Sequence, residues 1–174
     1  MQTQVYVDET KAKGYVVAAA AVLPGQLAGV RKALRALLPR AQRRLHMVDE
    51  ADPLRRKILT GLADAGAAVD LYVAGASYPT DVKRRRACLE RLVSDIAPEC
   101  ILLTLESDRT QDRRDRQDLA LITRKIGCPQ LRYAHESPYA EPLLWIPDAV
   151  GWAFARGGEW RDAARPIIRR VIDV

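Results

Sequence analysis

The sequence has few cysteines, few aromatic residues and no long apolar run. Cys88, Cys100 and Cys128 are odd in number and form no C-x-x-C pair, which argues against a disulfide framework or a cysteine-based zinc site. They indicate a reduced protein of the cytoplasm, with Cys100 and Cys128 as small core residues. Because aromatic residues make up only 6% of the chain, Ala, Val, Leu and Ile must supply most of its core.

The longest apolar stretch, "YVVAAAAVLPG", follows two lysines as in a signal peptide. It is too short to span a bilayer, and a strand that carries acidic residues precedes it. We therefore expect neither a targeting segment nor a membrane segment. The chain also lacks internal repeats, low-complexity tracts and linkers, so residues 1–174 are expected to form a single domain.

Basic residues outnumber acidic ones, 28 against 22, which gives a net charge of +6. This excess favours a polyanionic partner, nucleic acid above all, although a GC-rich genome would also enrich arginine. Basic residues concentrate in three segments, "RKALRALLPRAQRR", "VKRRRA" and "ARPIIRRV". If these segments converge they form a surface that follows a phosphate backbone, and if they scatter they are ordinary protein surface.

The pattern of apolar and turn residues predicts alternating strands and helices. Strands are predicted at 2–8, 14–23, 43–49, 68–76, 100–106 and 130–136. Pro24 and Gly25 open a first helical stretch, and further helices are predicted at 52–65, 80–96, 110–126, 142–156 and 159–172. An opening hairpin followed by this alternation implies an α/β fold, a mixed sheet with helices packed on it. Ligands of such sheets bind at the carboxyl ends of the central strands.

Three carboxylates stand where such a site would form. Asp8 ends the first strand, Glu106 ends the apolar strand "CILLTLE", and Asp148 opens an apolar helix. If the two strands are neighbours, Asp8 and Glu106 emerge at one sheet edge, and the helix could lay Asp148 across them. Three unpaired carboxylates would raise one another's pKa values, which a divalent cation such as Mg²⁺ would relieve. Such sites hydrolyse phosphodiesters.

Four segments resemble a known family: "VYVDETK", "RRLHM", "LLTLESDRTQDRR" and "LRYAHESPYAEPLLWIPDAVGWAFAR". Over residues 4–156 the chain resembles the domain-of-unknown-function family thirty-eight-hundred of the ribonuclease-H-like superfamily. The resemblance implies a ribonuclease-H-like sheet with Asp8, Glu106 and Asp148 as catalytic residues and as ligands of Mg²⁺ or Mn²⁺. The sequence departs from the family pattern at two places, where Thr10 and Lys11 replace Ser-Gly, and Trp145 and Pro147 replace Gln and Ala.

Several residues near these acids can be explained without a role in metal binding. Glu9 points to the opposite face of the strand from Asp8 and is expected to be a solvated turn residue. Arg109 could pair with Glu106 in place of a metal. His46 could assist proton transfer and His135 could support the site from outside, but both are expected to be structural.

In the charged stretch "DRTQDRRDRQD", Asp112 and Asp115 share one helical face. They would either pair with basic neighbours on a solvated helix or add acidic groups near Glu106.

The leading hypothesis is a metal-dependent nuclease that binds DNA or RNA through its basic surface. The alternative is a catalytically inactive module that keeps the fold and binds nucleic acid or protein. In the protein-binding version, a partner would cover Trp145, Trp152 and Trp160, although their spacing is more typical of core packing. A homo-oligomer is compatible with all of these hypotheses.

Overall fold

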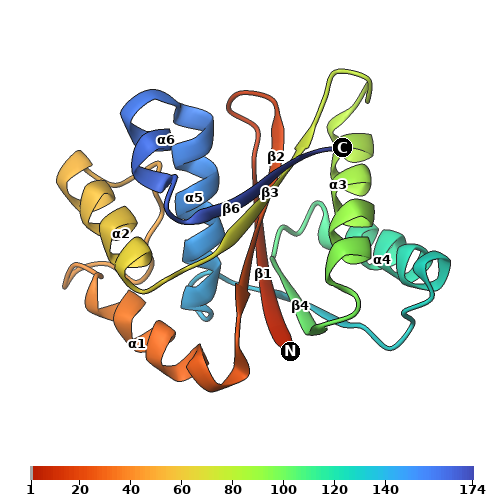
Figure 1. Cartoon of the computed structure of the whole chain (residues 1–174), viewed down its shortest axis with the longest axis horizontal. Helices are drawn as coiled ribbons and strands as arrows, with labels where there is room; N and C mark the ends of the chain where they lie inside the picture. Colours follow the sequence, from red (N-terminus) through yellow and green to blue (C-terminus); the bar gives the residue numbers. More distant parts are fainter. Residues whose placement is uncertain (1) are drawn as a thin grey trace.

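In the computed structural model, which describes residues 2–174, six strands form one mixed sheet (Figure 1). The strands are β1 (Thr3–Thr10), β2 (Tyr15–Val22), β3 (Val69–Ala74), β4 (Cys100–Glu106), β5 (Arg132–Glu136) and β6 (Ile168–Asp173). Their order is β5-β4-β1-β2-β3-β6. The strand β2 runs antiparallel to both β1 and β3, whereas the pairs β1–β4, β4–β5 and β3–β6 are parallel. The predicted mixed sheet with an opening antiparallel hairpin is confirmed.

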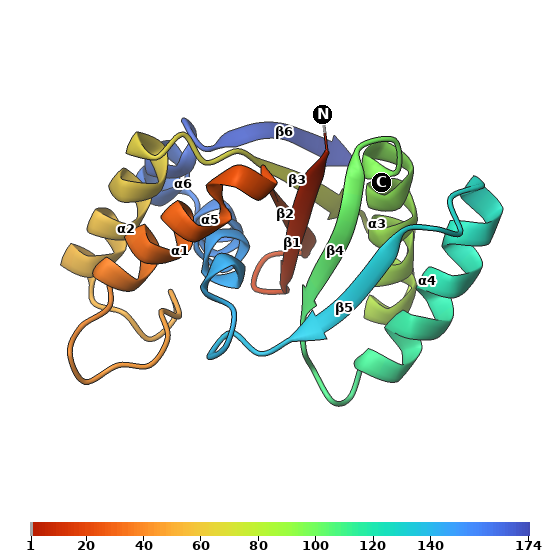
Figure 2. The same cartoon turned by 90° about the horizontal axis from the view of Figure 1, so that it is seen from below.

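Helices cover both faces of this sheet. They are α1 (Leu27–Ala36), α2 (Asp52–Asp64), α3 (Asp81–Ile96), α4 (Asp112–Ile126), α5 (Trp145–Arg156) and α6 (Gly158–Ala164), with 3₁₀ turns η1 (Pro24–Gln26) and η2 (Pro142–Leu144). Figure 2 shows α1, α2, α5 and α6 on one side of the sheet and α3 and α4 on the other. Within residues 2–174, no helix is both long enough and apolar enough to cross a bilayer.

The central strand β2 explains why two layers of helices are needed. Alternate side chains point to opposite faces of a strand, and in β2 both sets are apolar. Val16, Ala18 and Ala20 join the core under α1, α2, α5 and α6. Tyr15 and Val17 join the second core, under α3 and α4. A strand of this kind is stable only when both of its faces are covered.

The strand predicted at 43–49 does not form, and this prediction was wrong. These residues make turns and irregular structure between α1 and α2. Two amides of this segment donate to carboxylates rather than to a neighbouring strand. The amide of His46 donates to the buried carboxylate of Glu50 (3.2 Å), and the amide of Met47 donates to Asp148 (2.9 Å).

The prediction of a helix at 159–172 was also wrong for the second half of this segment. The helix α6 ends at Ala164, and Ile168–Asp173 forms β6 beside β3. Pro166 has no backbone N–H and so cannot donate the hydrogen bond that would continue the helix. Beyond Pro166, the chain pairs with an exposed sheet edge, which an isolated reading of "IIRRVID" does not reveal.

A buried carboxylate secures β6. Asp70 of β3 is 3% exposed and accepts hydrogen bonds from Arg169 (2.5 and 2.8 Å) and Arg170 (2.5 and 3.2 Å). Burial alone would raise the pKa of Asp70, but the two guanidinium groups lower it.

Replacing both Arg169 and Arg170 by Gln is therefore expected to destabilise the protein by about 3 kcal/mol, because Asp70 would keep a buried and unpaired charge. Each single replacement should cost less than about 1 kcal/mol, since one guanidinium remains. Urea unfolding of the single and double variants measures this difference. Additive effects of the two single changes would contradict the proposed sharing of Asp70.

Candidate active site

The structure brings Asp8, Glu106 and Asp148 to one cleft. Val7 of β1 pairs with Leu105 of β4, so the next residues on the two parallel strands, Asp8 and Glu106, emerge side by side. The helix α5 packs on β1 and β2, and Asp148 lies in its first turn. The cleft has a volume of about 160 Å³, and its lining also includes His46, Val48 and Trp152.

Burial and mutual repulsion make these three acids hard to ionise. The pKa of Asp8 is raised well above its ordinary value, first by loss of solvent and then by the charges of Glu106 and Asp148. Burial and the charge of Asp148 raise the pKa of Glu106 in the same way. Burial also raises the pKa of Asp148, although the amide of Met47 stabilises its charged form. Such shifted carboxylates gathered in a cleft are typical of functional sites.

Two basic side chains approach these acids without forming hydrogen bonds to them. Arg44 Nη1 lies 3.8 Å from Glu106 Oε1, and His46 Nε2 lies 3.8 Å from Asp148 Oδ1. Both distances exceed that of a hydrogen bond. Arg44 takes the place beside Glu106 that sequence analysis considered for Arg109. The segment "RRLHM" was the available signal, but only the turns at 43–49 bring it to the cleft.

Glu9 is bound by basic and amide groups and is not the solvated residue that was expected. It points away from Asp8 toward α3, where it forms an ion pair with the buried Arg85. Lys11 lies 3.4 Å from its carboxylate, and Gln111 donates a hydrogen bond to it (3.0 Å). The opposite orientation of Asp8 and Glu9 is thus as predicted, but the environment of Glu9 is not.

Arg85 continues this network into the protein. Its guanidinium donates two hydrogen bonds to Asp115, at 2.7 and 2.8 Å. His135 Nε2 lies 3.1 Å from Asp115 and 3.8 Å from Asp112. Asp112 in turn accepts a hydrogen bond from the amide of Asp108 (2.8 Å), in the loop that follows β4. These residues form one chain of polar contacts from the end of β1 to β5, and the structural interpretation of His135 fits it.

Three side chains of this network are close enough together to be considered as a metal-binding site. Within residues 2–174, the one set of three ligating side chains with atoms all inside 4.8 Å of each other is Asp112, Asp115 and His135. However, Arg85 already occupies both oxygens of Asp115, and a cation would have to approach against that guanidinium. The cleft acids are spaced more widely but lack such a partner. Three carboxylates that are only partly compensated by basic groups fit a hard divalent cation better.

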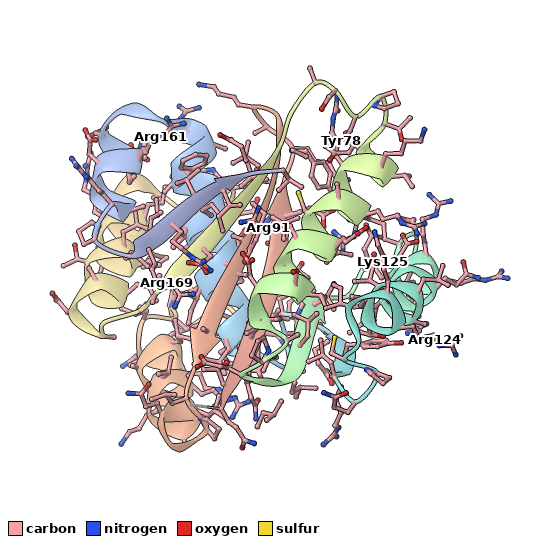
Figure 3. All side chains as sticks on the ribbon, turned by 45° about the vertical axis from the view of Figure 1, so that its right-hand side comes forward. Tyr78, Arg91, Arg124, Lys125, Arg161 and Arg169 are labelled. Atoms are coloured by element: carbon pink, nitrogen blue, oxygen red, sulfur yellow. The ribbon has the colours of Figure 1, made fainter. Side chains whose placement is uncertain are left out.

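The three basic segments do not form one patch. The helices α1 and α3 lie on opposite sides of the sheet, and β6 is at its edge (Figure 1). In Figure 3, labelled basic residues of α3, α4, α6 and β6 are spread widely over the molecule. Several others pair with acids, including Arg31 with Glu141 (2.6 Å) and Arg86 with Asp118 (3.1 Å). The scattered arrangement that sequence analysis allowed for is the one observed.

The tryptophans belong to the core. Trp145 and Trp160 are buried, and Trp145 donates a hydrogen bond to the carbonyl of Pro138 (2.7 Å). Trp152 is partly buried and packs edge-on against Trp160, with ring centroids 5.3 Å apart. A partner protein that covers exposed tryptophans is therefore not supported.

Comparison with known proteins identifies the class of fold. The structure is similar to a chain in the complex of PCNA with RNase HII from Archaeoglobus fulgidus, with a TM-score of 0.55 and 12% sequence identity. The match covers 87% of this chain and 70% of that chain. The protein therefore has a ribonuclease-H-like fold, as the sequence predicted. Neither a protein-family model nor a curated protein sequence matches the chain, so its likeness to the family named above depends on the short motifs alone.

Proposed function

We propose that this protein is a metal-dependent nuclease in which Asp8, Glu106 and Asp148 hold Mg²⁺ or Mn²⁺. The observation that carries the proposal is the cleft itself. It is lined by three acids, one each from β1, β4 and α5, and all three have raised pKa values. The ribonuclease-H-like fold is compatible with this function but does not by itself establish it.

When bound, the divalent cation would activate a water molecule and stabilise the leaving oxygen of a phosphodiester. The residues of this chain prepare the site for it. The amide of Met47 fixes one oxygen of Asp148, and the amide of Glu9 donates to Asp8 (2.7 Å). Because the three acids have raised pKa values and must be ionised to hold a cation, cation binding should strengthen as the pH rises through those values.

Cleavage of labelled DNA, RNA and hybrid substrates with Mn²⁺ tests the proposal. Glu106→Gln is expected to lower the cleavage rate by roughly 100-fold or more, since it removes a charge that would hold the cation. Glu136→Gln is a matched control, because Glu136 pairs with Glu106 in the sheet register but is exposed. It should cleave at the normal rate. Equal cleavage by both variants would contradict the assignment of Glu106.

A second candidate, a module that binds nucleic acid without cleaving it, is favoured by one observation. The guanidinium of Arg44 lies 3.8 Å from Glu106, and the imidazole ring of His46 lies 3.8 Å from Asp148. If these groups neutralise the cleft sufficiently, a cation is not needed. The protein would then show no thermal shift with Mg²⁺ or Mn²⁺, whereas the nuclease hypothesis requires one.

A further inference from the structure

An exposed aromatic ring stands beside the cleft. Tyr139 is 58% exposed and lies in the turn between β5 and η2. Guanidinium groups of two consecutive residues approach the ring, with the carbon of Arg44 at 5.3 Å and that of Arg43 at 5.8 Å from its centroid. Most large side chains of this protein are buried in its two cores, so an exposed tyrosine with two arginines is an unusual surface feature.

Arg44 connects this ring to the acidic cleft. The same guanidinium that approaches Tyr139 lies 3.8 Å from the carboxylate of Glu106. A ligand on the tyrosine ring would therefore extend directly toward the acids. Arg43, which is exposed, is free to follow the ligand outward, since no ion pair is found for it in the part of the chain that the structure describes.

The turn that carries Tyr139 is held firmly. Ser137 accepts hydrogen bonds from the amides of Tyr139 (3.2 Å, to its hydroxyl) and of Ala140 and Glu141 (both 2.9 Å, to its carbonyl). Glu141 also forms two hydrogen bonds with Arg31, at 2.6 and 3.0 Å. The ring thus projects from a fixed backbone, which lowers the entropy cost of binding something on it.

We propose that Tyr139, with Arg43 and Arg44, forms a platform on which an unpaired nucleobase stacks, so that the substrate is single-stranded nucleic acid. Every base presents a π-face that can stack on tyrosine, and guanidinium groups bind the phosphates on either side of it. Inside a duplex both faces of a base are covered by its neighbours, so a blunt duplex cannot use the ring. This inference names the substrate of the proposed nuclease and therefore builds on that proposal.

The test measures binding without cleavage. A fluorescently labelled 12-nucleotide single strand and the corresponding blunt duplex are titrated with the protein in EDTA. Tyr139→Ala is expected to weaken single-strand binding about 10-fold, the usual loss when a stacking side chain is removed. Tyr139→Phe, which keeps the ring, should bind within twofold of the native protein. Leu121→Ala removes an apolar side chain of similar exposure (53%) on α4 and should have no effect.

Equal binding by Tyr139→Ala and the native protein would overturn the inference, and so would an equal loss for the blunt duplex. Because EDTA removes divalent cations, these outcomes are independent of the nuclease proposal. A ring-dependent preference for single strands together with no Mn²⁺-dependent cleavage would retain the platform and reject the nuclease. Cleavage that depends on Glu106 but not on Tyr139, with no preference for single strands, would retain the nuclease and reject the platform.

Discussion

Replacing Asp8 by Asn is expected to abolish metal-dependent cleavage and, at the same time, to make the metal-free protein more stable. Asp8 would hold the cation, so its loss should remove several kcal/mol of transition-state stabilisation. The cleavage rate should then fall at least about 1,000-fold. The gain in stability has a different origin. Burial and the charges of Glu106 and Asp148 oppose the ionisation of Asp8 and raise its pKa.

The direction of this effect follows from proton linkage. The folded protein binds the proton of Asp8 more tightly than the unfolded chain, because its folded pKa is raised. The stabilisation from that proton is complete below the unfolded pKa of about 3.9 and is lost as the pH rises through the raised folded value. Above that range Asp8 destabilises the metal-free fold, and Asp8→Asn should be more stable than the native protein.

Thermal unfolding with EDTA and with Mg²⁺ separates the two roles. Native protein should be stabilised by Mg²⁺, whereas Asp8→Asn should have a higher melting temperature in EDTA and a smaller response to the cation. Asp49→Asn is a suitable control, since Asp49 is exposed and its contact with His46 lowers the pKa of Asp49. It should gain no stability. A loss of stability in Asp8→Asn would show that Asp8 is already neutralised within the protein.

Replacing Arg85 by Met is expected to destabilise the protein by about 3–5 kcal/mol, the usual effect of removing one partner from a buried ion pair. Arg85 is 7% exposed and holds Asp115, which is 2% exposed, with two hydrogen bonds. Burial alone would raise the pKa of Asp115, and the hydrogen bonds from Arg85 and His135 lower it. Without the guanidinium, Asp115 and Glu9 would face each other across a buried space.

The neighbouring residue provides the control. Arg86 forms an ion pair with Asp118 at 3.1 Å, but its side chain is 49% exposed, so Arg86→Met should cost less than about 1 kcal/mol. A double variant, Arg85→Met with Asp115→Leu, should be more stable than the sum of the single effects, because it removes both charges. Urea unfolding measures all of these variants. Similar losses for Arg85→Met and Arg86→Met would refute a structural role for the buried network.

Local sequence patterns predicted most elements of this fold. The predicted helix at 80–96 forms as α3, which begins after Thr80, and the hydroxyl of this N-cap residue accepts a hydrogen bond from the amide of Lys83 (3.3 Å). The helix α2 ends near Gly66, which has a positive φ of 69°. Patterns failed at 43–49 and at 168–173. In both segments the backbone conformation depends on a distant group, the Asp148 carboxylate in one and the open edge of β3 in the other.

The candidate site was predicted in part. Asp8 and Glu106 could be placed together because each was predicted to end an apolar strand, and parallel neighbours bring such ends to one edge. In the structure β1 continues to Thr10, but its pairing with β4 stops at Val7, just before Asp8. The partners of Glu9 could not be inferred, since Arg85 and Gln111 are 76 and 102 residues away along the chain. Tyr139 gave no signal either. Its importance depends on Arg43 and Arg44, which precede it by 96 and 95 residues in the chain. The irregular segment that carries these arginines brings them to the ring.

By itself, the sequence determined the alternation of strands and helices, the apolar central strands and the acids that follow their apolar residues, because these depend on local periodicity. Tertiary structure alone decided which charges meet. It turned Glu9 toward Arg85 and Asp8 toward Asp148, and it brought Arg44 between Tyr139 and Glu106. Electrostatic interactions act through space over a few ångströms, and a sequence does not specify which distant side chains come within that distance.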